Sequence, residues 1–129
     1  MAETILVNSD IDAGRELVSL LDEAGFPVTA AAWIYFPDVE EWRLVIRSPK
    51  AATNLQEALL ELARAMDAKG DLRKRLDLAR VKLVPPSDRM LEAMGKVTRI
   101  ISGLSTVRFS RNVVNGIYID DALIYRLAA

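Results

Sequence analysis

The sequence predicts an α+β fold, a single two-layer sandwich of one mixed or antiparallel sheet of about five strands with three helices. Apolar residues recur at helical spacing in three segments, and β-branched and aromatic residues fill the segments between them. Glycine, proline and asparagine separate the two kinds of segment. The order helix, hairpin, helix, strand, helix, hairpin mixes antiparallel pairs with helical crossovers. Because no internal repeat or linker interrupts it, we expect residues 1–129 to form one domain.

The first part of the chain is predicted to form a helix and then a hairpin. Ser9 or Asp10 can accept a hydrogen bond from a free amide of the first helical turn, so we expect the helix to begin there and to end at Gly25. Residues 28–36 are continuously apolar, which suits a strand covered on both faces. Residues 42–48 alternate between apolar and polar side chains, and the short polar loop between the two strands predicts an antiparallel hairpin.

The middle of the chain predicts a second helix and a third strand. Asn54 followed three residues later by Glu57 matches a capping box, and the helix that it opens is expected to end at Gly70. Residues 78–84 alternate in the same way and are followed by two prolines, which predicts a strand that ends at the first proline.

The last part of the chain predicts a third helix and a closing hairpin. Asp88 can cap this helix, which is expected to close near Gly103. Residues 106–127 are rich in β-branched and aromatic side chains and predict strands. Asn115-Gly116 is a strong two-residue turn signal, and Asp120-Asp121 is the alternative because two aspartates are unfavourable within a strand. We favour the turn at Asn115-Gly116.

The chain contains no histidine and no cysteine. These side chains supply most nucleophiles, most proton transfer near neutral pH and nearly all zinc, haem and iron–sulfur ligation. Their absence excludes a Ser-His-Asp or Cys-His hydrolase, a structural zinc module, a thioredoxin-type redox centre and a haem protein. The remaining chemistry would rest on carboxylates that hold a hard cation, on lysine or on hydroxyl groups. We expect no cofactor.

Two acidic motifs invite a metal-dependent interpretation. Pro37-Asp38 begins a signature of metal-dependent nucleases, but the next strand lacks the carboxylate and the lysine that this chemistry requires. Adjacent strand residues such as Asp120 and Asp121 point to opposite faces, so they hold one ion only if the backbone turns there. We therefore assign no catalytic, cofactor-binding or metal-binding residue.

Charge is segregated along the chain. Residues 1–69 hold 6 basic and 12 acidic side chains, whereas residues 70–112 hold 10 basic and 4 acidic ones. Such a split is typical of halves that pack against each other or against a second copy, and it also fits an anionic partner such as nucleic acid. The net charge of −1 opposes the nucleic-acid interpretation. The candidate partner- or anion-binding residues are Arg73, Lys74, Arg75, Arg80, Lys82, Arg108 and Arg111.

Three aromatic residues, Trp33, Tyr35 and Trp42, lie around the first predicted hairpin. Aromatic side chains in such positions form core contacts or cross-strand pairs. They would anchor a protein partner if one face of the hairpin were uncovered. We favour the core interpretation.

Two stretches carry a resemblance. The first comprises residues 31–35 and 41–46 around two tryptophans, and the second comprises residues 112–126, with an Asn-Gly pair, two aspartates and the run Ile-Tyr-Arg. Together they resemble a group of short bacterial proteins with no assigned activity, in which such a strand pair and closing segment occur in the same order. The resemblance implies a single cytoplasmic domain and carries over no catalytic or binding residue.

These observations lead to three hypotheses about function. We expect a non-enzymatic protein-interaction domain or small accessory subunit of a bacterial assembly, with a protein partner or with self-association. The alternatives are a nucleic-acid-binding module that uses residues 70–111 and a small enzyme that uses carboxylates and a metal ion. No apolar run approaches the roughly 18 residues that span a bilayer, and the first residues lack a basic region before an apolar core. We therefore expect a cytoplasmic protein without membrane association.

Overall fold

The computed structural model describes residues 5–97, 106–114 and 116–128. Its elements follow the predicted order of helices and hairpins, with short helical turns added between the longer elements. In chain order they are α1 (Asn8–Glu23), β1 (Ala30–Phe36), β2 (Glu41–Arg47), α2 (Lys50–Thr53), α3 (Leu55–Asp67), α4 (Leu72–Arg75), the 3-10 turn η1 (Leu78–Arg80), β3 (Val81–Val84), α5 (Arg89–Val97), β4 (Val107–Val114) and β5 (Ile117–Leu127).

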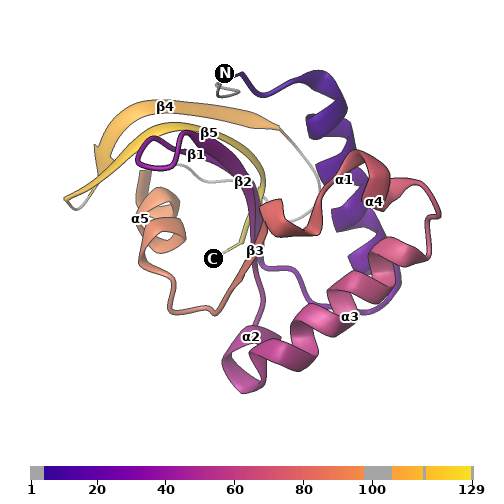
Figure 1. Ribbon diagram of the computed structural model, residues 1–129. Helices are drawn as coiled ribbons and strands as arrows, with labels where there is room; N and C mark the ends of the chain where they lie inside the picture. Colours follow the sequence, from indigo (N-terminus) through magenta and orange to yellow (C-terminus); the bar gives the residue numbers. More distant parts are fainter. Residues whose placement is uncertain (1–4, 98–105, 115, 129) are drawn as a thin grey trace.

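The strands form one five-stranded sheet in the order β3-β2-β1-β5-β4. The sheet is mixed, because β2 and β3 are parallel whereas every other neighbouring pair is antiparallel. Figure 1 shows that the sheet curves, with α1, α3 and α4 on its outer side and α5 within the curve. The predicted α+β sandwich and its number of strands are therefore confirmed, and α5 covers part of the second face.

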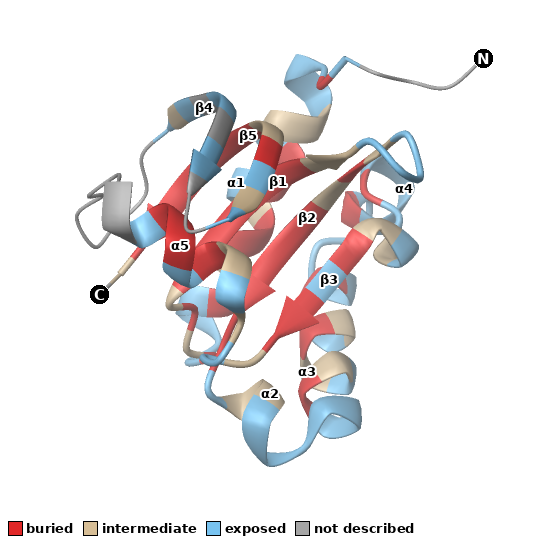
Figure 2. Ribbon diagram, turned by 90° about the vertical axis from the view of Figure 1, so that its left-hand side faces the viewer, coloured by how far each residue is buried: buried red, intermediate tan, exposed pale blue. Residues whose placement is uncertain are grey.

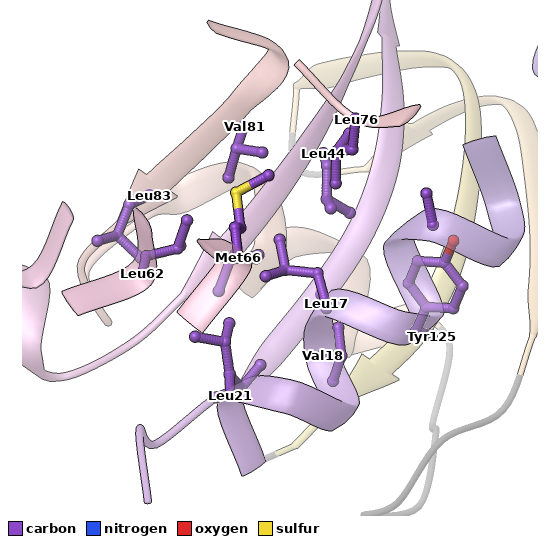
Figure 3. Packing of buried hydrophobic residues seen from close by; sticks show 14 of the residues in the cluster. Leu17, Val18, Leu21, Leu44, Leu62, Met66, Leu76, Val81, Leu83 and Tyr125 are labelled. Carbon is purple, nitrogen blue, oxygen red and sulfur yellow. The ribbon is translucent and has the colours of Figure 1, made fainter. Parts of the chain in front are cut away.

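The larger core lies between the sheet and α1, α3 and α4. Leu17 of α1, Leu62 of α3 and Leu44 of β2 are fully buried in it, and Figure 3 shows how such side chains meet. Burial of an aliphatic side chain of this size stabilises a fold by about 1.5–3 kcal/mol. The helical spacing of the apolar residues therefore aligns these helices on the sheet.

β1 is buried on both faces, as its continuous apolar sequence predicts. Trp33 faces the core on the α1 side, whereas Ala32 and Ile34 belong to the second core, with Leu91 and Met94 of α5. A central strand with a helix on each side has no face left for polar residues.

The predicted start of α1 is wrong in detail, and its predicted end is confirmed. Val7 occupies the N-cap position without a side-chain cap, and Asp10 lies in the first turn. The neighbouring Leu6 is buried in the core, so apolar burial rather than a capping hydroxyl or carboxylate fixes where the chain enters the helix. At the other end Gly25 has a φ of 76°, and the Phe26 amide donates to the Leu21 carbonyl at 2.9 Å, which terminates the helix.

The two later predicted caps are confirmed. The side chain of Asn54 accepts a hydrogen bond from the Glu57 amide at 3.1 Å, and that of Asp88 accepts one from the Leu91 amide at 3.0 Å. The predicted closure of the third helix near Gly103 lies outside the described residues.

The predicted third strand is shorter than residues 78–84. The Asp77 carboxylate accepts a hydrogen bond from the Ala79 amide at 2.9 Å and caps η1, so β3 begins only at Val81. An aspartate that bonds its own backbone two residues ahead competes with strand pairing, which explains the difference.

The closing hairpin turns at the position that the Asn115-Gly116 pair of the sequence predicts. Val114 pairs with Ile117, and Gly116 between them has a φ of 78°. Asn115 lies outside the described residues. The alternative turn at Asp120-Asp121 is wrong, because both aspartates lie within β5.

A bulge in β5 brings two consecutive side chains to α1. The register between β1 and β5 shifts between Ala31 and Ala32. The Tyr125 hydroxyl then donates to the Ile11 carbonyl in the first turn of α1, and the Arg126 guanidinium reaches the last turn of the same helix. β5 therefore fixes α1 at both ends.

The outer part of the β4–β5 hairpin extends beyond the sheet, because β1 pairs with β5 only as far as Asp121. Ile117, Ile119 and Ala122 all face the α5 core, so the alternation of β5 slips by one residue between Ile119 and Ala122. On β4 the pairing skips Arg111, whose φ is 48°. We call this outer part, residues 110–114 and 116–120, the ribbon; Figure 1 shows it curling over α5.

Candidate functional site

The predicted basic candidates do not share one element or one face. Arg73, Lys74 and Arg75 lie on α4, beside α1, and Arg80 ends η1. The other three lie on strands at opposite edges of the sheet, Lys82 on β3 and Arg108 and Arg111 on β4. The basic part of the sequence is therefore distributed around the molecule.

Four of the seven candidates are engaged by carboxylates of the same chain. The pairs are Arg73–Asp67, Arg75–Glu16, Arg80–Asp10 and Arg108–Asp121, at 3.1, 2.7, 3.2 and 2.6 Å. The first three join the basic segment to the acidic first half of the sequence. The hydrogen bond that the Arg75 guanidinium donates to Glu16 raises the pKa of Arg75 above its ordinary value.

The three other candidates, Lys74, Lys82 and Arg111, have no carboxylate within ion-pair distance in the described part of the chain. Lys82 instead places its ammonium 5.5 Å from the centroid of the Phe36 ring. Arg111 lies on the ribbon, where its charge acts on the Tyr118 hydroxyl.

The predicted aromatic residues are mainly core residues, with arginines packed on them. Trp33 is fully buried, donates to the Tyr125 hydroxyl at 3.0 Å and lies under the Arg80 guanidinium, 4.8 Å from the ring centroid. Trp42 is buried next to Tyr35, with ring centroids 5.6 Å apart. The core interpretation of both tryptophans is confirmed.

The two adjacent aspartates of β5 have different partners. Asp121 accepts hydrogen bonds from Arg108 and from the Ser110 hydroxyl, whereas Asp120 accepts one from the Tyr118 hydroxyl at 3.0 Å. Partial burial alone would raise the pKa of Asp121, but the hydrogen bonds from Arg108 and Ser110 outweigh it and hold that pKa below its ordinary value. The pair is thus engaged by side chains of the hairpin.

The other acidic motif, Pro37-Asp38, lies in the turn between β1 and β2. The Val39 amide donates to the Phe36 carbonyl at 3.2 Å, as in a tight turn. Within residues 5–97, 106–114 and 116–128, no three Asp or Glu side chains are grouped so that they could hold a metal ion.

Two buried arginines make hydrogen bonds that join distant parts of the fold. Arg126 makes two hydrogen bonds to the Asp22 carboxylate, at 2.9 and 2.8 Å. Arg47 donates to the Thr29 hydroxyl at 2.9 Å and to the Ala128 carbonyl at 2.8 Å. Burial lowers the pKa of Arg47, so the guanidinium depends on these acceptors.

The ribbon presents an apolar and aromatic outer face. Val113 and Tyr118 are cross-strand partners, and the two residues are 67% and 52% exposed. Ile117 and Ile119 on the opposite face pack toward α5, so Tyr118 faces away from it. We call Arg111, Val113 and Tyr118 the ribbon surface. Sequence reasoning missed it, although alternation about Ile117 and Ile119 could have indicated which residues face outward.

No family model, curated protein or solved structure matches the chain. The resemblance of residues 31–46 and 112–126 to a group of bacterial proteins therefore stays a prediction. Among the helices described here, none is long and apolar enough to cross a bilayer.

Proposed function

We propose that this protein is a non-enzymatic interaction domain of a bacterial assembly that binds a protein partner through the ribbon surface. The observation that carries the proposal is the exposed cross-strand pair Val113–Tyr118, with Arg111 two residues before Val113 on β4. Tyrosine and arginine are enriched among the residues that dominate binding energy in protein interfaces. A tyrosine combines a large apolar area with a polar tip, so it suits an interface that is exposed when the partner is absent.

The support beneath the ribbon strengthens the proposal. Ile119 is buried and Ile117 is partly buried against the core that contains Leu91 and Met94 of α5. Ile117 and Ile119 on the inner face therefore anchor the backbone of the ribbon, from which the exposed side chains of Val113 and Tyr118 project. A surface organised before binding loses less conformational entropy when the partner docks.

The ion pairs of the basic candidates favour a protein partner over nucleic acid. Phosphate groups would have to compete with Asp67, Glu16, Asp10 and Asp121 for the four arginines that these carboxylates engage. Nucleic-acid affinity depends on cations that are available to phosphates. The proposal therefore assigns these arginines to the fold and the binding to the ribbon surface.

The test uses the full chain and two matched variants. Tyr118→Ala removes the exposed aromatic ring, and Leu60→Ala on α3 removes an apolar side chain that is 50% exposed elsewhere. The full chain is immobilised, and the proteins that bind to it are identified. Each captured protein is then purified, and its affinity for the original chain and for both variants is measured directly. We expect Tyr118→Ala to weaken the affinity at least tenfold and Leu60→Ala to leave it unchanged.

Equal affinity of the original chain and the Tyr118→Ala variant for every captured protein would overturn the proposal. So would salt-sensitive retention of the chain on mixed-sequence DNA or RNA that survives the same substitution, since that result would assign the binding to the basic residues.

A further inference from the structure

We infer that Phe36, Arg43 and Lys82 form a binding site for an acidic side chain of a protein partner, on the face of the sheet that also carries α5. We call these three residues the carboxylate cluster. The inference rests on the proposed function, because it names the chemistry of a partner segment. It concerns a different surface from the ribbon surface.

The sheet register brings the three side chains together. Arg43 is the cross-strand partner of Ile34, and Lys82 is that of Val45. Ile34 and Val45 both belong to the α5-side core, so Arg43 and Lys82 emerge on that face. α5 packs against β4 and β5, and Figure 2 shows no described helix over the upper part of β2 and β3.

Both cations converge on one aromatic ring. The Arg43 guanidinium carbon lies 5.9 Å from the centroid of the Phe36 ring, and the Lys82 ammonium lies 5.5 Å from it. Each positive charge is attracted to the ring, and Lys82 pairs with Val45, two residues beyond Arg43 on β2, so the two cations lie on the same part of the sheet. Such an arrangement is favourable for an anion, because one anion can interact with both cations.

The hydrogen-bonding capacity of this pair is not used up within the chain. The Arg43 Nε atom is buried, has no hydrogen-bond partner among the described residues and forms an ion pair with the Glu41 carboxylate at 3.6 Å. The Arg43 side chain as a whole is 35% exposed, so atoms other than Nε remain accessible to a partner. Lys82 is exposed and has no described carboxylate within ion-pair distance.

The charge and shape of the cluster favour a carboxylate over a phosphate. Arg43 and Lys82 with the neighbouring Glu41 carry a local charge of about +1, which matches a single carboxylate, and Glu41 would repel a dianion. Phe36 and Val45 supply an apolar floor. This combination suits an acidic residue flanked by apolar residues in an extended partner segment.

The probe for the test is a synthetic peptide that alternates glutamate and leucine, and its matched control has glutamine in place of glutamate. Each peptide is titrated into the 15N-labelled full chain, and the Arg43 Nε–H signal is followed by NMR together with the backbone amide signals of β2 and β3, which also report on the Arg43→Gln variant. We expect the glutamate peptide to shift this signal saturably. We expect Arg43→Gln and Lys82→Gln each to weaken the peptide about threefold to tenfold, whereas Lys74→Gln on α4 leaves it unchanged.

Four outcomes would overturn the inference. They are no shift of the Arg43 signal, equal binding of the glutamine peptide, equal affinity in the Lys82→Gln variant, and saturation by inorganic phosphate at lower concentration than by the glutamate peptide. Each leaves the proposed function standing if partner capture still depends on Tyr118. Conversely, if Tyr118→Ala does not weaken partner binding but the glutamate peptide still binds, the proposed ribbon interface is rejected and the carboxylate cluster is supported.

Discussion

The hydroxyl group of Tyr125 lies where any residue other than glycine at position 14 would place its side chain. A β-carbon on Gly14 would lie 2.5 Å from that oxygen and 2.7 Å from Trp33 Nε1. Helix α1 thus approaches the sheet closely enough for Tyr125 to donate to the Ile11 carbonyl and to accept from Trp33. Gly14 is required by packing and not by backbone conformation.

We therefore predict that Gly14→Ala lowers the stability of the protein. Alanine would favour the helix by up to about 1 kcal/mol, but overpacking at a rigid contact costs about 1–3 kcal/mol. Thermal unfolding should show a lower Tm. Gly95→Ala on α5 is the control, because its β-carbon would lie 3.9 Å from the nearest Leu127 atom, an ordinary contact. A stabilised Gly14→Ala protein would contradict the prediction, and Tyr125→Phe should partly rescue it.

The pair between Arg126 and Asp22 should contribute measurably to stability. Arg126 is buried and makes two hydrogen bonds to the Asp22 carboxylate, so Asp22→Asn weakens a charge-assisted contact of a guanidinium that has little access to water. We expect a loss of about 1–3 kcal/mol in chemical denaturation. Glu23→Gln, one residue further and exposed, is the matched control. Equal losses in both variants would exclude a specific role for the pair.

Asp121 should make the stability of the protein depend on acid pH. Its pKa in the folded state is below the ordinary value, so its contribution is present above about pH 4 and is lost as the pH falls through the folded-state pKa. Asp121→Asn should therefore differ from the original protein at neutral pH, and the difference should shrink in acid. Asp38→Asn, in the exposed β1–β2 turn, reports the general effect of removing a surface carboxylate. A difference that stays constant with pH would refute the assignment.

Reversal of Arg73, Lys74 and Arg75 to glutamate should lower the Tm at low salt. The new carboxylates would face Glu16 and Asp67, which now pair with Arg75 and Arg73. Salt should reduce the effect, because it screens charges beyond about 8–10 Å. Lys74→Glu alone should have little effect. If the triple variant keeps its Tm but loses binding in a gel-shift assay with mixed-sequence DNA and RNA, these residues bind nucleic acid instead.

Removal of residues 115–129 should abolish cooperative thermal unfolding. The deletion takes away β5, which lies between β1 and β4 in the sheet, together with the buried Tyr125 and Ile124. Tyr118→Ser serves as the control, because this exposed side chain lies on the outer face of the ribbon. A cooperative transition in the truncated protein would show that β5 is dispensable.

Local sequence patterns predicted most of the fold. The capping residues Asn54 and Asp88, the glycines at 25 and 116, and the continuous apolar run of β1 each act within a few residues of themselves, so their effects can be inferred without the tertiary structure. The start of α1 could not be inferred in this way, since it depends on the burial of Leu6 by residues distant in the sequence.

The candidate sites were harder to predict for a related reason. A run of basic residues indicates charge, but the carboxylates that engage Arg75 and Arg80 lie 59 and 70 residues away. The slip in β5 also reverses which side chains face outward. A regular alternation extended from Ile117 and Ile119 along the whole strand would therefore assign the residues beyond the slip to the wrong face. Local alternation about Ile117 and Ile119 indicates that Tyr118 faces outward, whereas the carboxylate cluster is visible only once the strands are paired.

The bulge that brings Tyr125 and Arg126 to α1 also constrains the order of events during synthesis. Their contacts with Ile11 and Asp22 span 114 and 104 residues of sequence, and β1 acquires its second neighbour only from the same strand. Helix α1 and strand β1 are thus synthesised before β5, and their contacts with it form only after β5 has been synthesised. Until residues 121–127 have emerged from the ribosome, Trp33 lacks its Tyr125 partner and one edge of β1 is unpaired. From the synthesis of β1 until that of β5, the nascent chain therefore presents an unpaired strand edge, and a chaperone would matter most in this interval.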